Sequence, residues 1–431
     1  MSNVSELDEI TRLARALPDP SGFDPLIERI GDARCVLVGE ASHGTAEFYR
    51  WRAELTKRLI AERGFSFVAV EGDWPDCFDV NCWVKDRAAR GDTADAVLAR
   101  VERWPTWMWA NTEVAEFVDW LRDHNRRTGK VVGFYGLDVY SLWESIERIL
   151  RYLHEEHPDE LPAAKEALMC FEPYAEDPQR YAHATRFVPE GCEREVIDLL
   201  GDLRRLTRAD RGASEADFDA LQNSEVVAGA ERYYRTMIRS DNESWNVRDC
   251  HMADTLDRLM AHHGPTSKAV VWEHNTHVGD ARATDMALAG MINVGQLVRE
   301  RHRDDGVVLV GFSSFDGSVI AASGWGAPTR QMDVPAGRSD SHEALLHEVG
   351  STEPLLLVFP PDRSGAWLSA RRGHRAIGVV YDPHRDRHGN WVPTVMGGRY
   401  DALIHIDRTT ALHPLHAVPT GEEQETYPWA V

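Results

Sequence analysis

The sequence predicts an α/β protein with a mostly parallel sheet core, flanked by helices, and an inserted helical lobe that covers a cleft. Strand-like and helix-like segments alternate in the first and last thirds of the 431 residues. The strand-like segments are mostly apolar, as in parallel strands that helices cover on both faces. Between Ser141 and His263 only helical patterns occur. We therefore expect one unit whose α/β core comprises residues 1–140 and 264–431, with the helical lobe at residues 141–263.

The expected strands are short. In chain order they are CVLVG (35–39), FVAVEG (67–72), VVGFYG (131–136), AVVWEH (269–274), VVLVGF (307–312), LLLVF (355–359), AIGVVY (376–381) and ALIHI (402–406). The closing residues 418–431 are expected to form an extended surface segment.

The helix after the first strand is expected to place an arginine on its buried face. It begins near Thr45, and Arg52 falls four residues after Phe48, within the apolar stripe of the helix. A guanidinium cannot lose its proton, so a buried one needs an acceptor, for which Glu40 and Glu71 are the candidates. The alternative is that Arg52 extends along the helix to the lobe boundary.

Two further segments leave a choice open. Arg248 and Asp249 flank the apolar face of a helix in the expected lobe, so they could form an ion pair within the lobe or line the cleft. Trp104, Trp107 and Trp109 are expected in the core, with the wall of an apolar pocket as the alternative. Ser141 is expected to cap the first helix of the lobe.

Composition excludes several classes of protein. The formal net charge of −22 disfavours binding to nucleic acid, which needs a basic surface. No apolar run approaches the ~20 residues of a membrane span, and the first twenty residues show no signal-peptide pattern. We expect a cytoplasmic protein with no membrane partner.

The six cysteines are scattered without a C-x-x-C pair, which predicts reduced, mostly buried thiols and neither disulfides nor a zinc site. They are Cys35, Cys77, Cys82, Cys170, Cys192 and Cys250.

Ionisable residues follow four of the expected strands. They are Glu40 and His43, then Glu71, then Asp138, and finally Glu273, His274 and His277. The carboxyl ends of parallel strands share one edge of a sheet, where open α/β sheets bind ligands. Any one of these groups could be a satisfied structural residue, but their coincidence at four strand ends favours an acid–base site.

Missing motifs narrow the chemistry. The sequence has no G-x-S-x-G elbow, and phosphate-binding and dinucleotide-binding glycine patterns are absent. Two mechanisms remain: a water molecule is activated either by an imidazole or by a metal. His274 and His277 form an H-x-x-H pair that could contribute to a metal site, although the H-E-x-x-H arrangement is lacking. Spacing alone leaves both options open.

Six segments resemble the erythromycin esterase family, whose members include hydrolases that open macrolide lactone rings. They are GEASHGTAEFYRWR, VEGDWPDC, WEHNTHVGD, WNVRDCHMADTL, AIGVVYDP and DALIHID. The resemblance covers about Val36 to Asp407 and implies a hydrolase that needs no metal. Carried over residue by residue, it implies His43 as general base, Glu40 and Glu71 as its carboxylate partners, Arg52 as a cleft cation, and His274 and His277 as further site groups.

We therefore expect a hydrolase without a cofactor that acts on a small-molecule ester or lactone, a macrolide lactone among the candidates. Arg52 and one of the two later histidines would stabilise the oxyanion. Asp138, Arg248 and Asp249 are assigned to substrate binding. The alternatives are a metal-dependent hydrolase that uses the same histidines and glutamates as ligands, and a non-catalytic protein that binds a small molecule in the same cleft.

Overall fold

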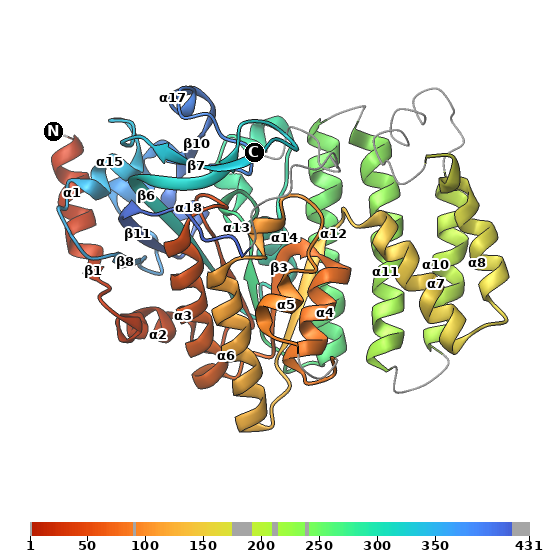
Figure 1. The fold of residues 1–431 in the computed structure, drawn as a ribbon. Helices are drawn as coiled ribbons and strands as arrows, with labels where there is room; N and C mark the ends of the chain where they lie inside the picture. Colours follow the sequence, from red (N-terminus) through yellow and green to blue (C-terminus); the bar gives the residue numbers. More distant parts are fainter. Residues whose placement is uncertain (1, 89–91, 175–191, 209–213, 238–240, 416–431) are drawn as a thin grey trace.

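A computed structural model describes residues 2–88, 92–174, 192–208, 214–237 and 241–415 (Figure 1). The expected surface segment at residues 418–431 lies outside this range. A nine-stranded sheet in the order β1-β8-β11-β6-β2-β5-β3-β4, with β7 paired to β6, forms the centre of the fold. The strands are β1 (Ala14–Ala16), β2 (Cys35–Val38), β3 (Phe67–Asp73), β4 (Gly133–Asp138), β5 (Ala269–Trp272), β6 (Val307–Ala322), β7 (Thr329–Val334), β8 (Leu355–Val358) and β11 (Ala402–Thr409).

The sheet is mostly parallel. Strands β11, β6, β2, β5, β3 and β4 pair in parallel, whereas β1, β8 and β7 each run antiparallel to a neighbour. A second sheet pairs β9 (Arg371–Arg375) with β10 (Trp391–Val395). The α/β class and the mostly parallel sheet are thus confirmed.

One expected strand is wrong. Residues 376–381 are apolar, but they form no strand and make only single bridges, Ile377 with Ser42 and Val380 with Ala322. The segment is buried because it packs beside the ends of β2 and β6, so burial rather than strand pairing explains its apolar composition.

Helices cover both faces of the sheet. In β2, Val36 and Val38 pack into one core layer, and Cys35 and Leu37 pack into the other. The first layer is completed by α2 (Asp24–Ile30), α3 (Ala46–Arg63), α5 (Ala94–Leu98) and α6 (Thr112–Thr128). The second is completed by α1 (Ser2–Leu13), α12 (Asp241–His263), α14 (Val294–Arg301), α15 (His342–His347), α16 (Ala366–Ser369) and α18 (Met396–Arg399), while α4 (Trp74–Val84) contributes to both.

Beyond β4, four helices pack side by side on a core of their own, at the right of Figure 1. They are α7 (Leu142–Glu156), α8 (Leu161–Leu168), α10 (Glu193–Arg208) and α11 (Glu215–Met237). Ser141 occupies the N-cap position of α7, as expected, although its side chain makes no capping hydrogen bond. Helix α12 lies between this group and the sheet, where Met252 and Leu256 pack against the sheet.

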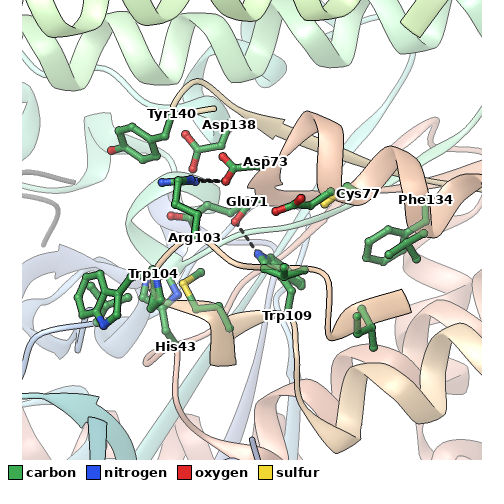
Figure 2. Close-up of a pocket in the computed structure, with 18 of the residues that line it drawn as sticks. His43, Glu71, Asp73, Cys77, Arg103, Trp104, Trp109, Phe134, Asp138 and Tyr140 are labelled. Atoms are coloured by element: carbon green, nitrogen blue, oxygen red, sulfur yellow. Dashed lines mark hydrogen bonds and ion pairs between the residues drawn. The ribbon is translucent and has the colours of Figure 1, made fainter. Parts of the chain in front are cut away.

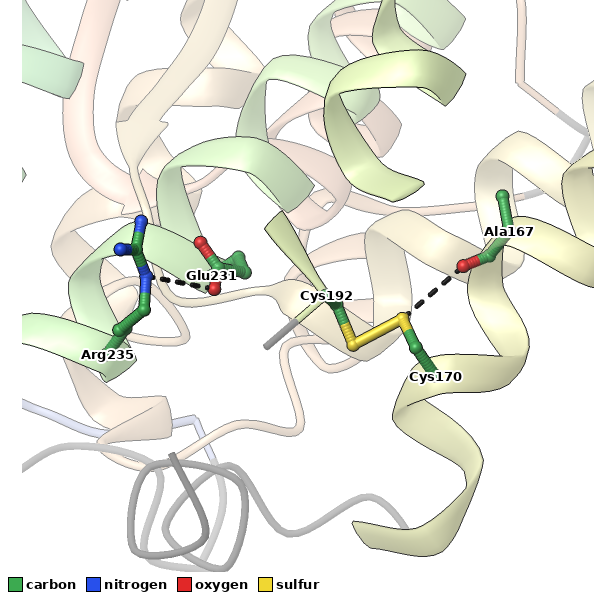
Figure 3. The surroundings of a disulfide bond; sticks show 5 residues. All are labelled: Ala167, Cys170, Cys192, Glu231 and Arg235. Carbon is green, nitrogen blue, oxygen red and sulfur yellow. Dashed lines mark hydrogen bonds and ion pairs between the residues drawn. A yellow bond between two sulfur atoms is a disulfide. The ribbon is translucent and has the colours of Figure 1, made fainter. Parts of the chain in front are cut away.

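The expectation of reduced thiols is wrong for two cysteines. Cys170 and Cys192 form a disulfide bond (Figure 3). The two residues are 22 positions apart in the sequence, with no paired spacing to indicate a bridge, but the packing of α8 against α10 brings their Cα atoms to 5.7 Å. Cys35, Cys77, Cys82 and Cys250 are free.

Candidate active site

The four strands that end in ionisable residues are neighbours in the sheet. Their order is β2-β5-β3-β4 and all pairs are parallel, so their carboxyl ends share one edge. His43, Glu71 and Asp138, which follow three of these strands, line a single cavity (Figure 2). Arg248 of α12 lines the same cavity. Among the residues that the structure describes, it is the only one between positions 141 and 263 that does so. Four of the residues that the sequence analysis singled out therefore line one cavity.

His43 lines the cavity, and a carboxylate holds one of its ring nitrogens. Its Nδ1 lies 2.8 Å from Oε1 of Glu40. A carboxylate only accepts hydrogen bonds, so we assign the ring hydrogen to Nδ1, which leaves a lone pair on Nε2. The short turn after β2 allows this contact, because Glu40 and His43 are three residues apart.

Arg52 lies behind Glu40 rather than in the cavity. Its Nη2 is 3.1 Å from Oε2 of Glu40, and its side chain is fully buried. The guanidinium lies over the rings of Tyr49, at 4.3 Å, and Trp272, at 4.9 Å. Burial of Arg52 on the inner face of α3 agrees with the sequence pattern. Its expected role as a cleft cation is wrong, because α3 points the side chain into the core below the cavity.

Arg248 is the cavity-lining cation that pairs with Glu71 and Asp138. Its Nε and Nη2 donate to both oxygens of Asp138 at 2.9 and 2.6 Å, and Nη2 also donates to Oε1 of Glu71 at 2.8 Å. Its Nη1 donates to Nε2 of His277 at 2.8 Å. A guanidinium has five N–H groups, so these four bonds leave one N–H on Nη1 without a bond to a described residue.

His277 and Asp249 support Arg248 from behind the wall. The Nδ1 of His277 donates to the carboxylate of Asp249 at 3.0 Å, which fixes the ring so that Nε2 accepts from Arg248. The backbone N–H of Val294 also donates to Asp249. Asp249 is fully buried and does not line the cavity. Its assignment to substrate binding is therefore corrected to a supporting position, because its side of α12 faces α14.

His274 is also behind the wall and lies next to His43. The two rings are 4.9 Å apart, and the Nδ1 of His274 accepts from the side chain of Thr276. The backbone N–H of His274 donates to Oε2 of Glu71 at 2.8 Å. Because Glu71 binds both this backbone and Arg248, it connects the β5 loop to α12. Glu273, the third candidate of this loop, is buried with no hydrogen bond to its carboxyl oxygens among the described residues.

The ionisation of the cluster follows from these contacts. Burial lowers the pKa of His43, but the charge of Glu71 and the hydrogen bond and charge of Glu40 outweigh it, so the net pKa is raised. Burial raises the pKa of Glu71, but the nearby groups His277, Arg248 and His43 lower it by more than burial raises it. The net pKa is below its usual value, and the carboxylate stays ionised. Burial, with the charge of His43, holds the pKa of His274 well below its usual value, so His274 is neutral.

Several lining residues were missed by the sequence analysis. Asp73, Asp76 and Arg103 line the cavity. The available signal was the GDWPDC stretch, in which two more carboxylates follow Glu71 at the same strand end. Trp104 and Trp109 thus take the pocket-wall alternative, whereas Trp107 is fully buried in the core, as expected.

The described residues contain no group of three His, Cys, Asp or Glu side chains arranged to hold a metal ion. His274 and His277 do not converge on a common point, because one ring binds Thr276 and the other lies between Asp249 and Arg248. Within the same part of the chain, no helix is long and apolar enough to cross a membrane.

Comparison with known proteins agrees with the resemblance in the motifs. The family model described as erythromycin esterase matches residues 60–409. The chain belongs to the erythromycin esterase family. Erythromycin esterase type II of Escherichia coli is 29% identical over 117 residues, which are 27% of this chain and 26% of that protein, so the aligned part spans about a quarter of the relative's length.

Three solved structures have a similar fold. A protein from Bacillus cereus has a TM-score of 0.80 at 18% identity, over 96% of this chain and 99% of its own. A succinoglycan biosynthesis protein has a TM-score of 0.77 at 21% identity, over 95% and 98% of the two chains. The erythromycin esterase EreC in an open conformation has a TM-score of 0.67 at 17% identity, over 92% and 98%. Membership in the family supports a hydrolase of the esterase type.

Proposed function

We propose that this protein hydrolyses a carboxylic ester or lactone with a water molecule that His43 activates. The observation that carries the proposal is the Glu40–His43 pair, in which the carboxylate fixes one nitrogen of a ring that lines the cavity. An imidazole held in this way can accept a proton from water as the water attacks a carbonyl carbon. Its raised pKa makes it a stronger base once it is neutral.

Arg248 supplies the charge that the reaction develops. The attack of water on an ester carbonyl produces a negatively charged oxygen, and a fixed N–H donor beside it lowers the barrier. The remaining N–H of Arg248 Nη1 is such a donor, and the bonds to Asp138 and His277 hold it in place. Arg248 therefore takes the oxyanion role that the sequence analysis gave to Arg52. His274 and His277 support the site through Glu71 and Arg248.

The proposed reaction needs no cofactor, because His43 both accepts and returns the proton. His43 takes one proton from water, the hydroxide forms the new C–O bond, and the tetrahedral intermediate expels the alcohol oxygen. His43 then returns its proton to that oxygen, so that an ester yields an acid and an alcohol and a lactone yields a hydroxy acid. Macrolide lactones belong to the proposed substrate range because of the family's named members.

A hydrolysis screen by mass spectrometry tests the proposal. Purified protein is incubated with a panel of macrolides, simple lactones and linear esters, and each product is inspected for the mass gain of one water or for the acid and alcohol fragments. Turnover that is lost in His43→Ala supports the proposal. If bound ligands are found but none is hydrolysed, the non-catalytic binding alternative replaces it.

A further inference from the structure

A second pocket lies at the edge of the sheet opposite the candidate active site. Its lining includes Val307, where β6 begins, and Gly398 of α18, just before β11. Strands β6 and β11 run parallel to β2, and the candidate active site lies at the other, carboxyl ends of the parallel strands. The second pocket has a volume of about 590 Å³, which is in the range of small-molecule sites.

Arginines dominate the lining of this pocket. Its charged lining residues are Arg282, Arg299, Arg303, Arg363, Asp280 and Glu300. Four guanidiniums therefore accompany two carboxylates, and the lining has an excess of two positive charges. The chain as a whole has a formal net charge of −22, so this local excess does not follow from its composition.

The carboxylates beside these arginines are shared between several of them. Asp280 accepts from Arg282 at both oxygens, at 2.9 and 2.7 Å, and from Arg299 at 3.1 Å. Asp401, which is buried and does not line the pocket, accepts from Arg299 at 2.8 Å and from Arg363 at 2.5 Å. Each carboxylate thus contacts two guanidiniums at once, and the charges of the arginines are only partly neutralised.

These arginines keep hydrogen-bond donors that no described residue accepts. Arg299 and Arg363 each use three of their five N–H groups on carboxylate or carbonyl oxygens, so two remain on each side chain. Arg303 lines the pocket and makes no hydrogen bond or ion pair with any described residue. A guanidinium cannot lose its proton, so the pocket offers these donors to an anion.

The fold holds Arg363 at the pocket despite repulsion between the arginines. Its φ of 52° lies in the left-handed region, which is uncommon for a residue with a side chain. Its Nη1 donates to the carbonyl of Gly397 at 2.7 Å. Burial lowers the pKa of this guanidinium, and the charges of Arg299 and Arg29 lower it further, by more than the attraction of Asp401 raises it. An anion in the pocket would oppose this effect.

A phosphate group suits the pocket better than a carboxylate. A phosphate dianion matches the two excess positive charges, and its oxygens can each accept from a guanidinium fork. The described lining contains no aromatic side chain, so a nucleobase would find no ring on which to stack. These features favour a compact phosphate compound over a nucleotide.

We propose that this pocket, which we call the arginine pocket, binds a phosphate dianion, as free phosphate or as the phosphate group of a small phosphomonoester without an aromatic ring. Arg299, Arg303 and Arg363 donate to the phosphate oxygens. The inference does not rest on the proposed hydrolysis, because the arginine pocket shares no described lining residue with the active-site cavity.

Isothermal titration calorimetry on the full-length protein tests this inference. The probes are inorganic phosphate, glycerol 3-phosphate and acetate, at constant ionic strength and about pH 8, where phosphate is mostly a dianion. We expect at least one phosphate compound to bind about tenfold more tightly than acetate, because a dianion can pair with more than one guanidinium. Tighter binding of glycerol 3-phosphate identifies a phosphomonoester as the ligand, and equal or weaker binding identifies free phosphate. If acetate binds as tightly as both, or neither phosphate compound binds, the inference is overturned.

Three variants locate the binding. Arg303→Gln should weaken phosphate binding about tenfold, since a charge-assisted hydrogen bond is lost, and the fold should persist because Arg303 has no partner among the described residues. Arg330→Gln, on an exposed position of β7 beside the far end of β6, removes the same charge and should leave the affinity unchanged. Arg103→Gln removes a cation from the active-site cavity and should also leave it unchanged.

Two patterns among these variants would contradict the inference. If Arg103→Gln abolishes phosphate binding and Arg303→Gln does not, the anion binds in the active-site cavity. If Arg330→Gln weakens binding as much as Arg303→Gln, the protein attracts phosphate through its overall charge and the arginine pocket is not a site.

Discussion

Glu40 binds His43 with one carboxylate oxygen, at 2.8 Å, and faces Arg52 with the other, at 3.1 Å. The imidazole at the cavity is therefore connected through one carboxylate to a guanidinium in the core. This arrangement fixes the orientation of His43 and determines how the protein responds to substitutions on either side of Glu40.

His43→Ala should lose activity and keep its stability. Removal of a general base lowers kcat by about 10² to 10⁴, whereas the buried pair of Glu40 and Arg52 remains in place. We expect the free energy of unfolding to change by no more than about 1 kcal/mol. Turnover of any ester found in the screen and chemical denaturation, measured on one preparation, check both values. A folded variant with near-normal kcat would remove His43 from the mechanism.

Glu40→Gln should lose stability as well as activity. The neutral amide leaves the fully buried Arg52 without its carboxylate, and breaking a buried pair in this way costs about 3 kcal/mol or more. Denaturant titration of Glu40→Gln beside Glu116→Gln, an exposed glutamate on α6, measures the difference. If the two variants are equally stable, Glu40 does not hold Arg52 in the core.

Activity should fall at acidic pH, with an inflection above the ordinary histidine pKa of about 6.5. Protonated His43 has no lone pair to accept a proton from water, and Glu71 and Glu40 raise its pKa by stabilising the protonated form. In Glu71→Gln the largest raising contribution is gone, so the inflection should move to lower pH. The pH dependence of kcat in the two proteins measures this shift. An unchanged inflection would assign the titration to another group.

Two arginine-to-lysine variants should distinguish an arginine that acts in the reaction from an arginine that stabilises the fold below the cavity. Arg248→Lys replaces a planar fork that binds three partners at once, and we expect kcat/KM to drop by about 10² or more. Arg52→Lys loses its position over Tyr49 and Trp272, so its main effect should be on the free energy of unfolding, by about 2 kcal/mol. Steady-state kinetics and denaturation of both variants distinguish these outcomes. The reverse pattern would return Arg52 to the catalytic role.

Treatment with chelators should leave activity unchanged. The motif resemblance implies hydrolysis without a metal, and no three potential ligand side chains come together in the described part of the chain. Activity is measured after dialysis against a strong chelator and after addition of stoichiometric zinc. Loss on dialysis followed by recovery with zinc would replace the proposed mechanism with the metal-dependent alternative.

The sequence predicted which strand ends converge better than the side-chain contacts beyond them. Strands β2, β3, β4 and β5 are buried on both faces, so each is a plain apolar run whose end is easy to recognise. The side-chain partners beyond those ends depend on distances across the fold. Arg52 was correctly expected on the buried face of α3, but only the packed structure distinguishes Glu40 below the cavity from Glu71 in its wall.

Other features had weak sequence signals. The apolar segment at residues 376–381 was expected to pair as a strand because burial and strand pairing favour the same side chains. The disulfide joins two cysteines through tertiary packing, which no spacing rule indicates. Asp73 and Asp76 were visible in the sequence, but their place in the wall depends on the start of α4 at Trp74 directly after β3.

Because Arg52 is buried, the residues that determine which ligand fits are separate from those that hold the general base in place. The lining residues are open to a ligand, whereas Arg52, Tyr49 and Trp272 lie outside the lining, where Arg52 pairs with Glu40 and lies over the two rings. Substitutions in this inner layer therefore act on the cavity only through Glu40, which orients His43. A change in the lining can therefore alter which ligands fit while this support of the general base stays in place.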